Sequence, residues 1–163
     1  MVIILSGVSG SGKTTIGIEL SQQMGYQFLD ADDFHPDSNI KKMSSGIPLT
    51  EADRLPWLTS LRRRIEEYLE SGEDLVLACS ALSRASRDRL RADDDNVRIV
   101  YLQGEKDLIR QRLQSREGHF VGAELLDSQF DALEEPNEAT VVCISRSPRQ
   151  IVAQIINELR LVL

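Results

Sequence analysis

Five short apolar runs, separated by longer segments with helical periodicity, constrain the fold of this chain more than any other feature of its sequence. The runs are VIIL, YQFL, DLVLACS, VRIVYL and TVVCIS, at residues 2–5, 26–29, 74–80, 97–102 and 140–145. They are rich in β-branched residues and lack a clean alternation of apolar and polar positions, which is typical of parallel strands covered on both faces. Because strand and helix alternate five times, the pattern predicts a doubly wound α/β sheet.

Two of the intervening segments and the segment after the last run carry an apolar stripe at helical spacing. The stripes are Ile16/Leu20/Met24, Leu58/Leu61/Ile65/Leu69 and Ile151/Ile155/Leu159. Thr50 to Asp53 resembles a capping box at the start of the second helix, with Asp in place of Glu at its fourth position. Ser147 and Pro148 supply an N-cap and a first-turn proline for the last helix.

Length and composition limit the class of protein. At 163 residues, the sequence predicts a single domain over 1–163. A net charge of −7 with both signs dispersed argues against a nucleic-acid partner, which would require a basic stripe. No apolar run reaches membrane-spanning length and no secretory signal is recognisable, so we expect no membrane contact and a cytoplasmic location. Cys79 and Cys143 lie inside apolar runs, which predicts two buried thiols.

The strongest chemical signal is GVSGSGKT at residues 7–14, which fits the P-loop pattern G-x-x-x-x-G-K-[ST] after one expected strand and before a helix. Its glycines let the backbone wrap around phosphates, so that successive N–H groups and the positive helix end face the anion. Lys13 can then reach the β- and γ-phosphates of ATP, and Thr14 can offer its hydroxyl to Mg²⁺. The predicted nucleotide-binding residues are Gly7, Gly10, Ser11, Gly12, Lys13, Thr14 and Thr15.

A glycine-rich segment of this kind also occurs in proteins that are not kinases, but those classes fit its residues less well. A glycine-rich turn before an ordinary helix remains the simplest alternative. A dinucleotide site is disfavoured because Thr15 replaces the third glycine of G-x-G-x-x-G and the Lys-Thr pair has no use there. A GTPase would require N-K-x-D and D-x-x-G. An ATPase of the Walker B type would require an acid at the end of the third run, which ends in Ser80 instead.

Acidic residues follow the second apolar run, in DADDFHP at residues 30–36. In small-molecule kinases of the P-loop class the second strand ends beside the γ-phosphate. One carboxylate there can accept the proton of a substrate hydroxyl, and another can help to hold Mg²⁺ through water. A solvated loop whose aspartates cap a helix is the alternative.

Three longer segments make a resemblance specific: DADDFHPDSNIKKMSSGIPLTEADRLPWL, CSALSRASRDRLR and LQSREGHFVGAELLDSQFDALEEP, at 30–58, 79–91 and 113–136. With the P-loop, they resemble the gluconokinase family, which phosphorylates D-gluconate to 6-phosphogluconate. The resemblance implies a three-layer α/β/α fold with a five-stranded parallel sheet. It also implies a substrate-binding helical region at about 35–70, a mobile lid at about 112–132, ATP with Mg²⁺, and a homodimer.

The same resemblance assigns roles to the acids and the histidine. Asp32 matches the second acid of the family's D-x-D and becomes the expected base or hydroxyl-orienting group, while Asp30 would act near the metal with Thr14. Asp33 receives no role. His35 would hydrogen-bond the polyol, although a histidine that caps the next helix is a fair alternative.

Basic residues in the matching blocks would hold the sugar acid. Lys42, Arg54 and Arg87 are the expected substrate ligands, because a carboxylate is best bound by the paired N–H donors of arginine. For Arg54 and Arg87 a surface ion pair is the alternative. The run Arg62 to Arg64 matches no chemical motif and is expected to face solvent.

The segment from residue 110 to 129 is expected to form the lid. Arg112 and Arg116 are one helical turn apart, so both can face the phosphates in a closed lid, with Arg116 counted as catalytic beside Lys13 and Asp32. His119 and Gln129 are expected to bind gluconate, although Gln129 could be an ordinary exposed helix residue. Family geometry places adenine near residues 145–148 and the start of the lid.

Two other functions stay open on the sequence. A kinase of the same fold could act on shikimate or on another sugar acid. A nucleotide-binding regulatory protein with little transferase activity would be of a different class and could lose the acids and the lid arginines without losing its function.

Overall fold

A five-stranded parallel sheet forms the centre of the computed structural model, which describes residues 1–92, 94–115 and 123–162. The strands are β1 (Val2–Ser6), β2 (Gln27–Asp30), β3 (Leu75–Ala78), β4 (Val97–Gln103) and β5 (Thr140–Cys143), in the spatial order β2-β3-β1-β4-β5. β1 is central, and its Val2 lies opposite Leu75 of β3 and Val97 of β4. The apolar runs therefore form one parallel sheet, as predicted.

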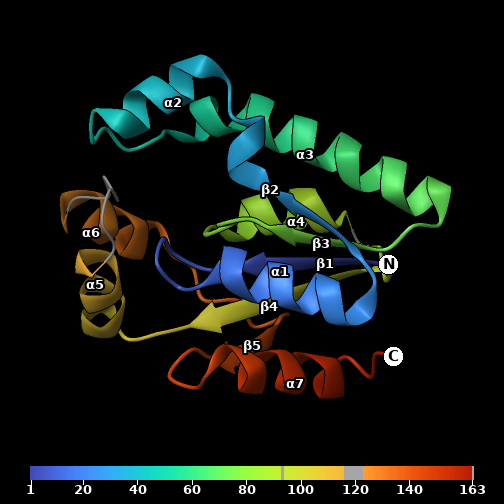
Figure 1. Ribbon diagram of the computed structural model, residues 1–163. Helices are drawn as coiled ribbons and strands as arrows, with labels where there is room; N and C mark the ends of the chain where they lie inside the picture. The colour runs from blue at the N-terminus through green and yellow to red at the C-terminus, as the bar shows by residue number, and fades with distance from the viewer. Residues whose placement is uncertain (93, 116–122, 163) are drawn as a thin grey trace.

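Helices lie on both faces and at one end of this sheet (Figure 1). They are α1 (Lys13–Met24), the 3₁₀ turn η1 (Ala31–Phe34), α2 (Asp37–Ser44), α3 (Glu51–Ser71), α4 (Arg84–Arg91), α5 (Lys106–Gln114), α6 (Ala123–Ala132) and α7 (Pro148–Glu158). Within the described part of the chain, no helix is long and apolar enough to cross a membrane.

Neighbouring residues of β1 belong to two hydrophobic clusters, because successive side chains of a strand point to opposite faces. Ile3 packs in one cluster with Ile16 of α1 and Ile151 of α7. Ile4 packs in the other with Leu61 of α3. Complete burial of each such side chain stabilises the fold by about 1.5–3 kcal/mol. The two clusters confirm the three-layer α/β/α architecture.

Two helix starts have the predicted capping chemistry. At the start of α3 the Thr50 hydroxyl accepts from the Asp53 N–H at 3.1 Å, while the Asp53 carboxylate accepts from the Thr50 N–H at 2.9 Å. At the start of α7, Ser147 and Gln150 form the same reciprocal pair, and Pro148 occupies the first turn. Each capping box fixes the residue at which its helix begins.

The outer strands correct one prediction about burial. β2 and β5 lie at the sheet edges, and Gln27 and Val141 are exposed. Cys143 at the end of β5 is also exposed, so the prediction of a buried thiol there was wrong. An edge strand has a neighbour on one side only, and residues near its end can face solvent despite an apolar sequence. Cys79 is buried as predicted, and its burial raises the pKa of the thiol to about 12.

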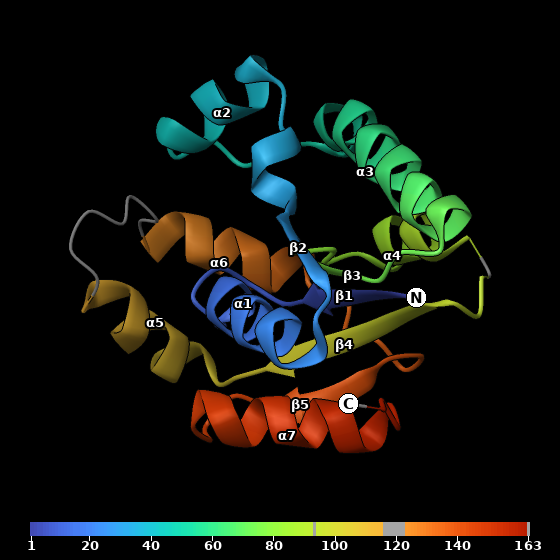
Figure 2. The same ribbon diagram turned by 45° about the vertical axis from the view of Figure 1, so that its right-hand side comes forward.

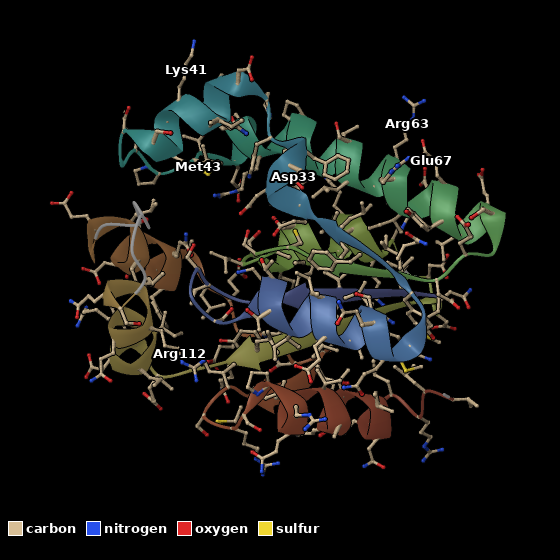
Figure 3. The ribbon with its side chains drawn as sticks, viewed as in Figure 1. Asp33, Lys41, Met43, Arg63, Glu67 and Arg112 are labelled. Atoms are coloured by element: carbon tan, nitrogen blue, oxygen red, sulfur yellow. The ribbon has the colours of Figure 1, made fainter. Side chains whose placement is uncertain are left out.

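The run of three arginines is not entirely a solvated face. Arg62 donates from Nη1 to the Leu90 and Arg91 carbonyls at 2.9 and 3.2 Å, and so binds the C-terminal end of α4 to α3. A basic side chain at a helix C-terminus satisfies carbonyls that have no partner within the helix. Arg63 is exposed, as expected, and Figure 3 shows it pointing away from the sheet.

The carboxyl ends of the strands form the functional edge of the molecule. Figure 1 shows α2, α5 and α6 beyond these ends, and in the turned view of Figure 2 α2 again lies above α6. In open α/β sheets ligands bind outside the carboxyl ends, where connections leave in opposite directions along the sheet. Here that position is the end of β1, between β3 and β4.

Candidate active site

The P-loop joins β1 to α1 and requires glycine at two points. Gly10 has a φ of 80°, and a Cβ there would lie 2.8 Å from Cγ of Leu113. Gly12 is the N-cap of α1, with a φ of 97°. Side chains are strained at such positive φ values, so glycine is the residue that lets this loop curl over the helix N-terminus.

Two polar side chains of the loop fit an anionic ligand. Lys13 Nζ donates to the carbonyls of Gly7 and Val8 at 2.9 and 3.0 Å, which folds the side chain back across the loop. The Ser11 hydroxyl is buried and has no hydrogen-bond partner among the described residues. A buried hydroxyl of this kind is normally satisfied by a partner. Phosphate oxygens would supply one.

A hydroxyl and a carboxylate meet beside the loop. Thr14 Oγ1 donates to Asp30 Oδ2 at 2.9 Å, and Asp30 Oδ1 accepts from the Asp32 N–H at 3.0 Å. Such oxygen donors fit Mg²⁺, which binds through one or two protein groups together with phosphates and water. In the described ranges, no cluster of three or more His, Cys, Asp or Glu residues could hold a metal ion. Thr14 and Asp30 are therefore two oxygen donors that a metal bound to phosphates could use.

A cavity of about 210 Å³ lies on one side of the P-loop. Gly10, Thr15, Arg112 and Pro148 are among the residues that line it. Arg112 donates from Nη2 to the Ile144 carbonyl at 2.7 Å and reaches inward from α5 (Figure 3). The cavity lies where the nucleotide was expected, between the loop that precedes α7 and the start of the lid segment.

A second cavity, of about 370 Å³, lies on the other side of the loop. It brings together five of the predicted site residues: Lys13, Asp32, His35, Arg54 and Gln129. Its remaining walls come from α2, the segment before α3, the end of β3 and α6. The apolar part of the wall includes Met43, Pro48, Leu49, Trp57, Leu82 and Leu125.

Asp32 projects into this second cavity. Its pKa is raised, first by the loss of water around the carboxyl group and then by repulsion from Asp30, while Lys13 opposes the rise. The side chain is still 79% exposed, so we expect the rise to stay modest until ligands fill the cavity. A carboxylate with a raised pKa is better suited to accept a proton in a reaction.

His35 forms part of the wall and is neutral near pH 7. Its ring stacks on Trp57 with centroids 4.2 Å apart and planes 13° apart. Burial lowers its pKa to about 4. Trp57 is held in turn, because its Nε1 donates to the Ala31 carbonyl at 2.7 Å.

Arg54 has the geometry of an anion ligand. It lines the cavity, and Nη1 donates to the Leu49 carbonyl at 3.0 Å. A guanidinium carries five N–H donors in a fixed fork, and this bond uses one of them. Arg54 is thus oriented by the segment before α3 while most of its donors point elsewhere.

Two predicted substrate ligands do not line the cavity. Arg87 is 2% exposed, and it donates from Nε to Glu138 at 2.9 Å and from Nη1 to the Ala81 and Leu82 carbonyls. Lys42 binds the Asp53 carboxylate at 2.7 Å. Both side chains, which the sequence predicted to bind a substrate, therefore form ion pairs within the protein.

Gln129 connects α6 to the P-loop. Its Oε1 accepts from the Ser9 N–H at 2.7 Å, and its Nε2 donates to Ser9 Oγ at 3.0 Å. It is therefore not an ordinary exposed helix residue, and Ser9 becomes part of the site. Arg116 and His119, the other lid predictions, lie outside the described residues.

The sequence prediction missed Ser9, Ser80 and Trp57, all of which line the second cavity. Trp57 could have been found, because it is the only tryptophan of the chain and lies three residues after Arg54 on the same helix. Ser9 and Ser80 carried no such signal, since serine is common in turns.

A P-loop with one cavity on its nucleotide side and a second cavity lined by Lys13, Asp32 and Arg54 defines the chain as a P-loop kinase of small molecules. A family model described as "AAA domain" matches residues 2–136. The gluconokinase of Gluconobacter oxydans is 43% identical over 136 residues, which cover 83% of this chain and 76% of that protein. The chain belongs to the gluconokinase family.

Solved structures agree with this assignment. A sugar kinase from Janibacter has a TM-score of 0.91 and 40% identity, and the match covers 98% of this chain and 94% of the other. A gluconokinase from Sinorhizobium meliloti has a TM-score of 0.84 and 36% identity, with 98% and 95% covered. The predicted kinase fold is confirmed.

Proposed function

We propose that the chain transfers the γ-phosphoryl group of ATP to D-gluconate and forms 6-phospho-D-gluconate. The observation that carries the proposal is the second cavity, which is lined by Arg54, the Asp32 carboxylate and the buried His35 together with the P-loop lysine. Gluconate has one carboxylate and several hydroxyls, and this wall offers a partner for each kind of group. The named activity of the relatives supports the same substrate.

The nucleotide side is proposed to work through backbone donors and two side chains. The N–H groups from Gly10 to Thr15 bind the phosphates, Lys13 contacts the β- and γ-oxygens, and Thr14 with Asp30 would hold the metal. When bound, Mg²⁺-ATP would supply the phosphoryl group and a divalent charge that offsets the charge of the phosphates. The Thr14–Asp30 pair supports this arrangement, as does the Ser11 hydroxyl, which is buried without a partner in the part of the chain that the structure describes.

The acceptor side is proposed to position one hydroxyl. Arg54 binds the gluconate carboxylate, His35 and Gln129 bind hydroxyls, and Asp32 orients the terminal hydroxyl and accepts its proton. The bond from that oxygen to the γ-phosphorus forms as the bond to the β-phosphate oxygen breaks. Most of the acceleration comes from positioning and charge neutralisation.

Further parts of the proposal rest on the family resemblance. Mg²⁺ is the proposed metal, Arg112 and Arg116 stabilise the transferring group, and His119 binds gluconate when the lid closes. A homodimer in the cytoplasm is the proposed working form. Light scattering on a size-exclusion column tests the dimer directly.

A coupled assay of ADP release tests the proposal. Purified protein with Mg²⁺-ATP is offered D-gluconate, its epimers, shikimate and glucose in separate reactions. We expect turnover with gluconate and little with the others. Glucose in particular is neutral and lacks the carboxylate that Arg54 would bind. Turnover on another acid alone would replace the substrate, and absence of turnover by protein that binds ATP would favour a nucleotide-binding regulator.

A further inference from the structure

Asn39 makes two hydrogen bonds with one nitrogen, and one of them is to His35, which lines the second cavity. It lies on α2, one turn after His35, and is 2% exposed. Its Nδ2 donates to the Asp53 carbonyl at 2.9 Å and lies 3.2 Å from Nδ1 of His35. A main-chain carbonyl can only accept, so the atom that faces it is the amide nitrogen and not the amide oxygen. The second hydrogen of the same NH₂ group is then available to His35.

This contact determines which nitrogen of His35 carries the proton. A donor that faces Nδ1 requires a lone pair there, and a neutral imidazole with a lone pair on Nδ1 has its hydrogen on Nε2. The other tautomer and the imidazolium would both set an N–H group against the amide N–H. Burial, which lowers the pKa of His35 to about 4, also disfavours the imidazolium.

Asn39 is itself held in a fixed place. Asp53, whose carbonyl accepts from Asn39, is the third residue of α3, and its carboxylate closes the capping box with Thr50. The same carboxylate binds Lys42, one turn after Asn39 on α2, at 2.7 Å. The two helices are thus joined at Asp53 by two contacts, one from Asn39 and one from Lys42. Lys42, which the sequence assigned to the substrate, here supports the wall of the cavity.

Charged groups around His35 come from three elements. Asp32 Oδ1 of η1 lies 3.9 Å from Nε2, which is too long for a hydrogen bond. Lys13 of the P-loop and Arg54 of α3 line the same cavity. An imidazolium would be attracted to Asp32 and would compete with the substrate for that carboxylate. A neutral ring leaves Asp32 available.

We propose that Asn39 is a positioning residue that sets the Nε2–H tautomer of His35, so that the ring donates a hydrogen bond to an oxygen of the acceptor while Asp32 receives the reacting hydroxyl. The tautomer follows from the contacts alone. The hydrogen bond to the acceptor rests on the proposed function.

Nitrogen-15 NMR of the full-length protein tests the tautomer without any activity. The chain has two histidines, and the signals that disappear in His35→Gln belong to His35. We expect a protonated Nε2 and an unprotonated Nδ1 from about pH 8 to about pH 5.5. A proton on Nδ1 in the wild-type protein would overturn the proposal.

Asn39→Asp reverses the contact, because a carboxylate facing Nδ1 favours a proton there. We expect the pKa of His35 to rise by about one unit or more and the KM for gluconate to rise about tenfold, with the KM for ATP unchanged. Asn39→Ala is a second variant, which should show a mixture of tautomers. Lys41→Ala is the matched control on α2, since Lys41 is exposed and points away from the cavity in Figure 3.

A double-mutant cycle separates positioning from general structural damage. Glutamine at position 35 keeps an N–H donor that cannot titrate. If Asn39 acts through the proton of His35, Asn39→Asp should have no further effect on the KM for gluconate in the His35→Gln background. An equal rise in both backgrounds would overturn the proposal. Failure of the wild-type protein to phosphorylate gluconate would overturn the proposed function and leave the NMR result to decide the tautomer.

Discussion

At the scale of single residues, the site depends on side chains with similar chemistry that the fold places differently. Asp32 and Asp33 are two neighbouring acids of η1, and only Asp32 lines the second cavity. Arg54 and Arg87 both lie in family blocks, and only Arg54 reaches that cavity. These pairs offer variants in which one member controls for the other.

Asp32→Asn keeps the shape of the side chain and removes its charge and basicity. We expect kcat to fall by about 10²–10⁴-fold, because proton acceptance by a positioned base contributes that much, while ATP binding stays near normal. Steady-state kinetics and a nucleotide titration measure the two effects. Asp33→Asn is the matched control and should retain kcat. An unchanged kcat in Asp32→Asn would remove its proposed role.

The two arginines should give different defects. Arg54→Ala should raise the KM for gluconate while sparing ATP, because it removes the proposed carboxylate ligand. Arg87→Ala should lower the free energy of unfolding by on the order of 2 kcal/mol, because it breaks charged hydrogen bonds of a buried side chain. The melting temperature should then drop by about 4–8 °C.

Arg84→Ala is the control for Arg87 on the same helix, since Arg84 is 74% exposed and its ion pair with Asp88 should contribute little. A stable Arg87→Ala protein with a raised KM for gluconate would contradict the structural role and return Arg87 to the substrate.

The buried His35 should make stability depend on pH. The unfolded chain binds a proton at His35 below about pH 6.5, whereas the folded protein does so only below about pH 4. Between these values the unfolded state binds more protons, so this contribution to stability is complete above pH 6.5 and is lost as pH falls. We expect a loss on the order of 2 kcal/mol between pH 7 and pH 5. In His35→Gln, the melting temperature should depend less on pH between pH 5 and pH 7. The same dependence as in the wild-type protein would refute the assignment of this effect to His35.

At the scale of elements, the contact between α6 and the P-loop joins a helix that lines the second cavity to the loop beside the first. Gln129 of α6 holds both the N–H and the hydroxyl of Ser9. The P-loop is thereby connected to α6, the helix that forms one wall of the second cavity. A substitution in α6 should consequently change the KM for ATP.

Gln129→Leu removes both hydrogen bonds and keeps a side chain of similar size. We expect the KM for ATP and the KM for gluconate each to rise about tenfold, because two hydrogen bonds of about 1 kcal/mol no longer fix Ser9. Asp131→Ala, at an exposed position of the same helix, is the control. If only the KM for gluconate rises, Gln129 acts as a substrate ligand alone, and its contacts with Ser9 do not position the loop for ATP.

At the scale of the whole molecule, a feature was predicted correctly from the sequence when neighbouring residues determine it. It was missed when residues far apart in the chain determine it. The capping boxes at Thr50 and Ser147 depend on a few neighbouring residues and are confirmed. The exposure of Cys143 depends on β5 being an edge strand, and sheet order is not visible in a single apolar run. The motif gave Arg87 a chemical type but could not show that Glu138, fifty-one positions later, would pair with it.

The same distinction holds for the candidate site. The positions of the P-loop and of Asp32 were predictable because sequence motifs place them directly after β1 and β2. Ser9, Ser80 and Asn39 were not, because each acquires its role from a partner on a distant element or from the three-dimensional shape of the cavity. Prediction from sequence alone therefore reached residues whose place a local motif fixes, and missed those whose place depends on a distant partner, as it also did for the pairing of Arg87 with Glu138.

The most direct test of the central claim is phosphorus-31 and carbon-13 NMR of the product that the wild-type protein forms from Mg²⁺-ATP and D-gluconate. The proposed function predicts ADP and one new phosphate monoester, with phosphorus coupled to the terminal carbon farthest from the carboxylate. Asp32→Asn should form this product far more slowly. Release of inorganic phosphate alone, or a phosphate on another oxygen, would contradict the proposed placement of gluconate with its carboxylate at Arg54 and its terminal hydroxyl at Asp32.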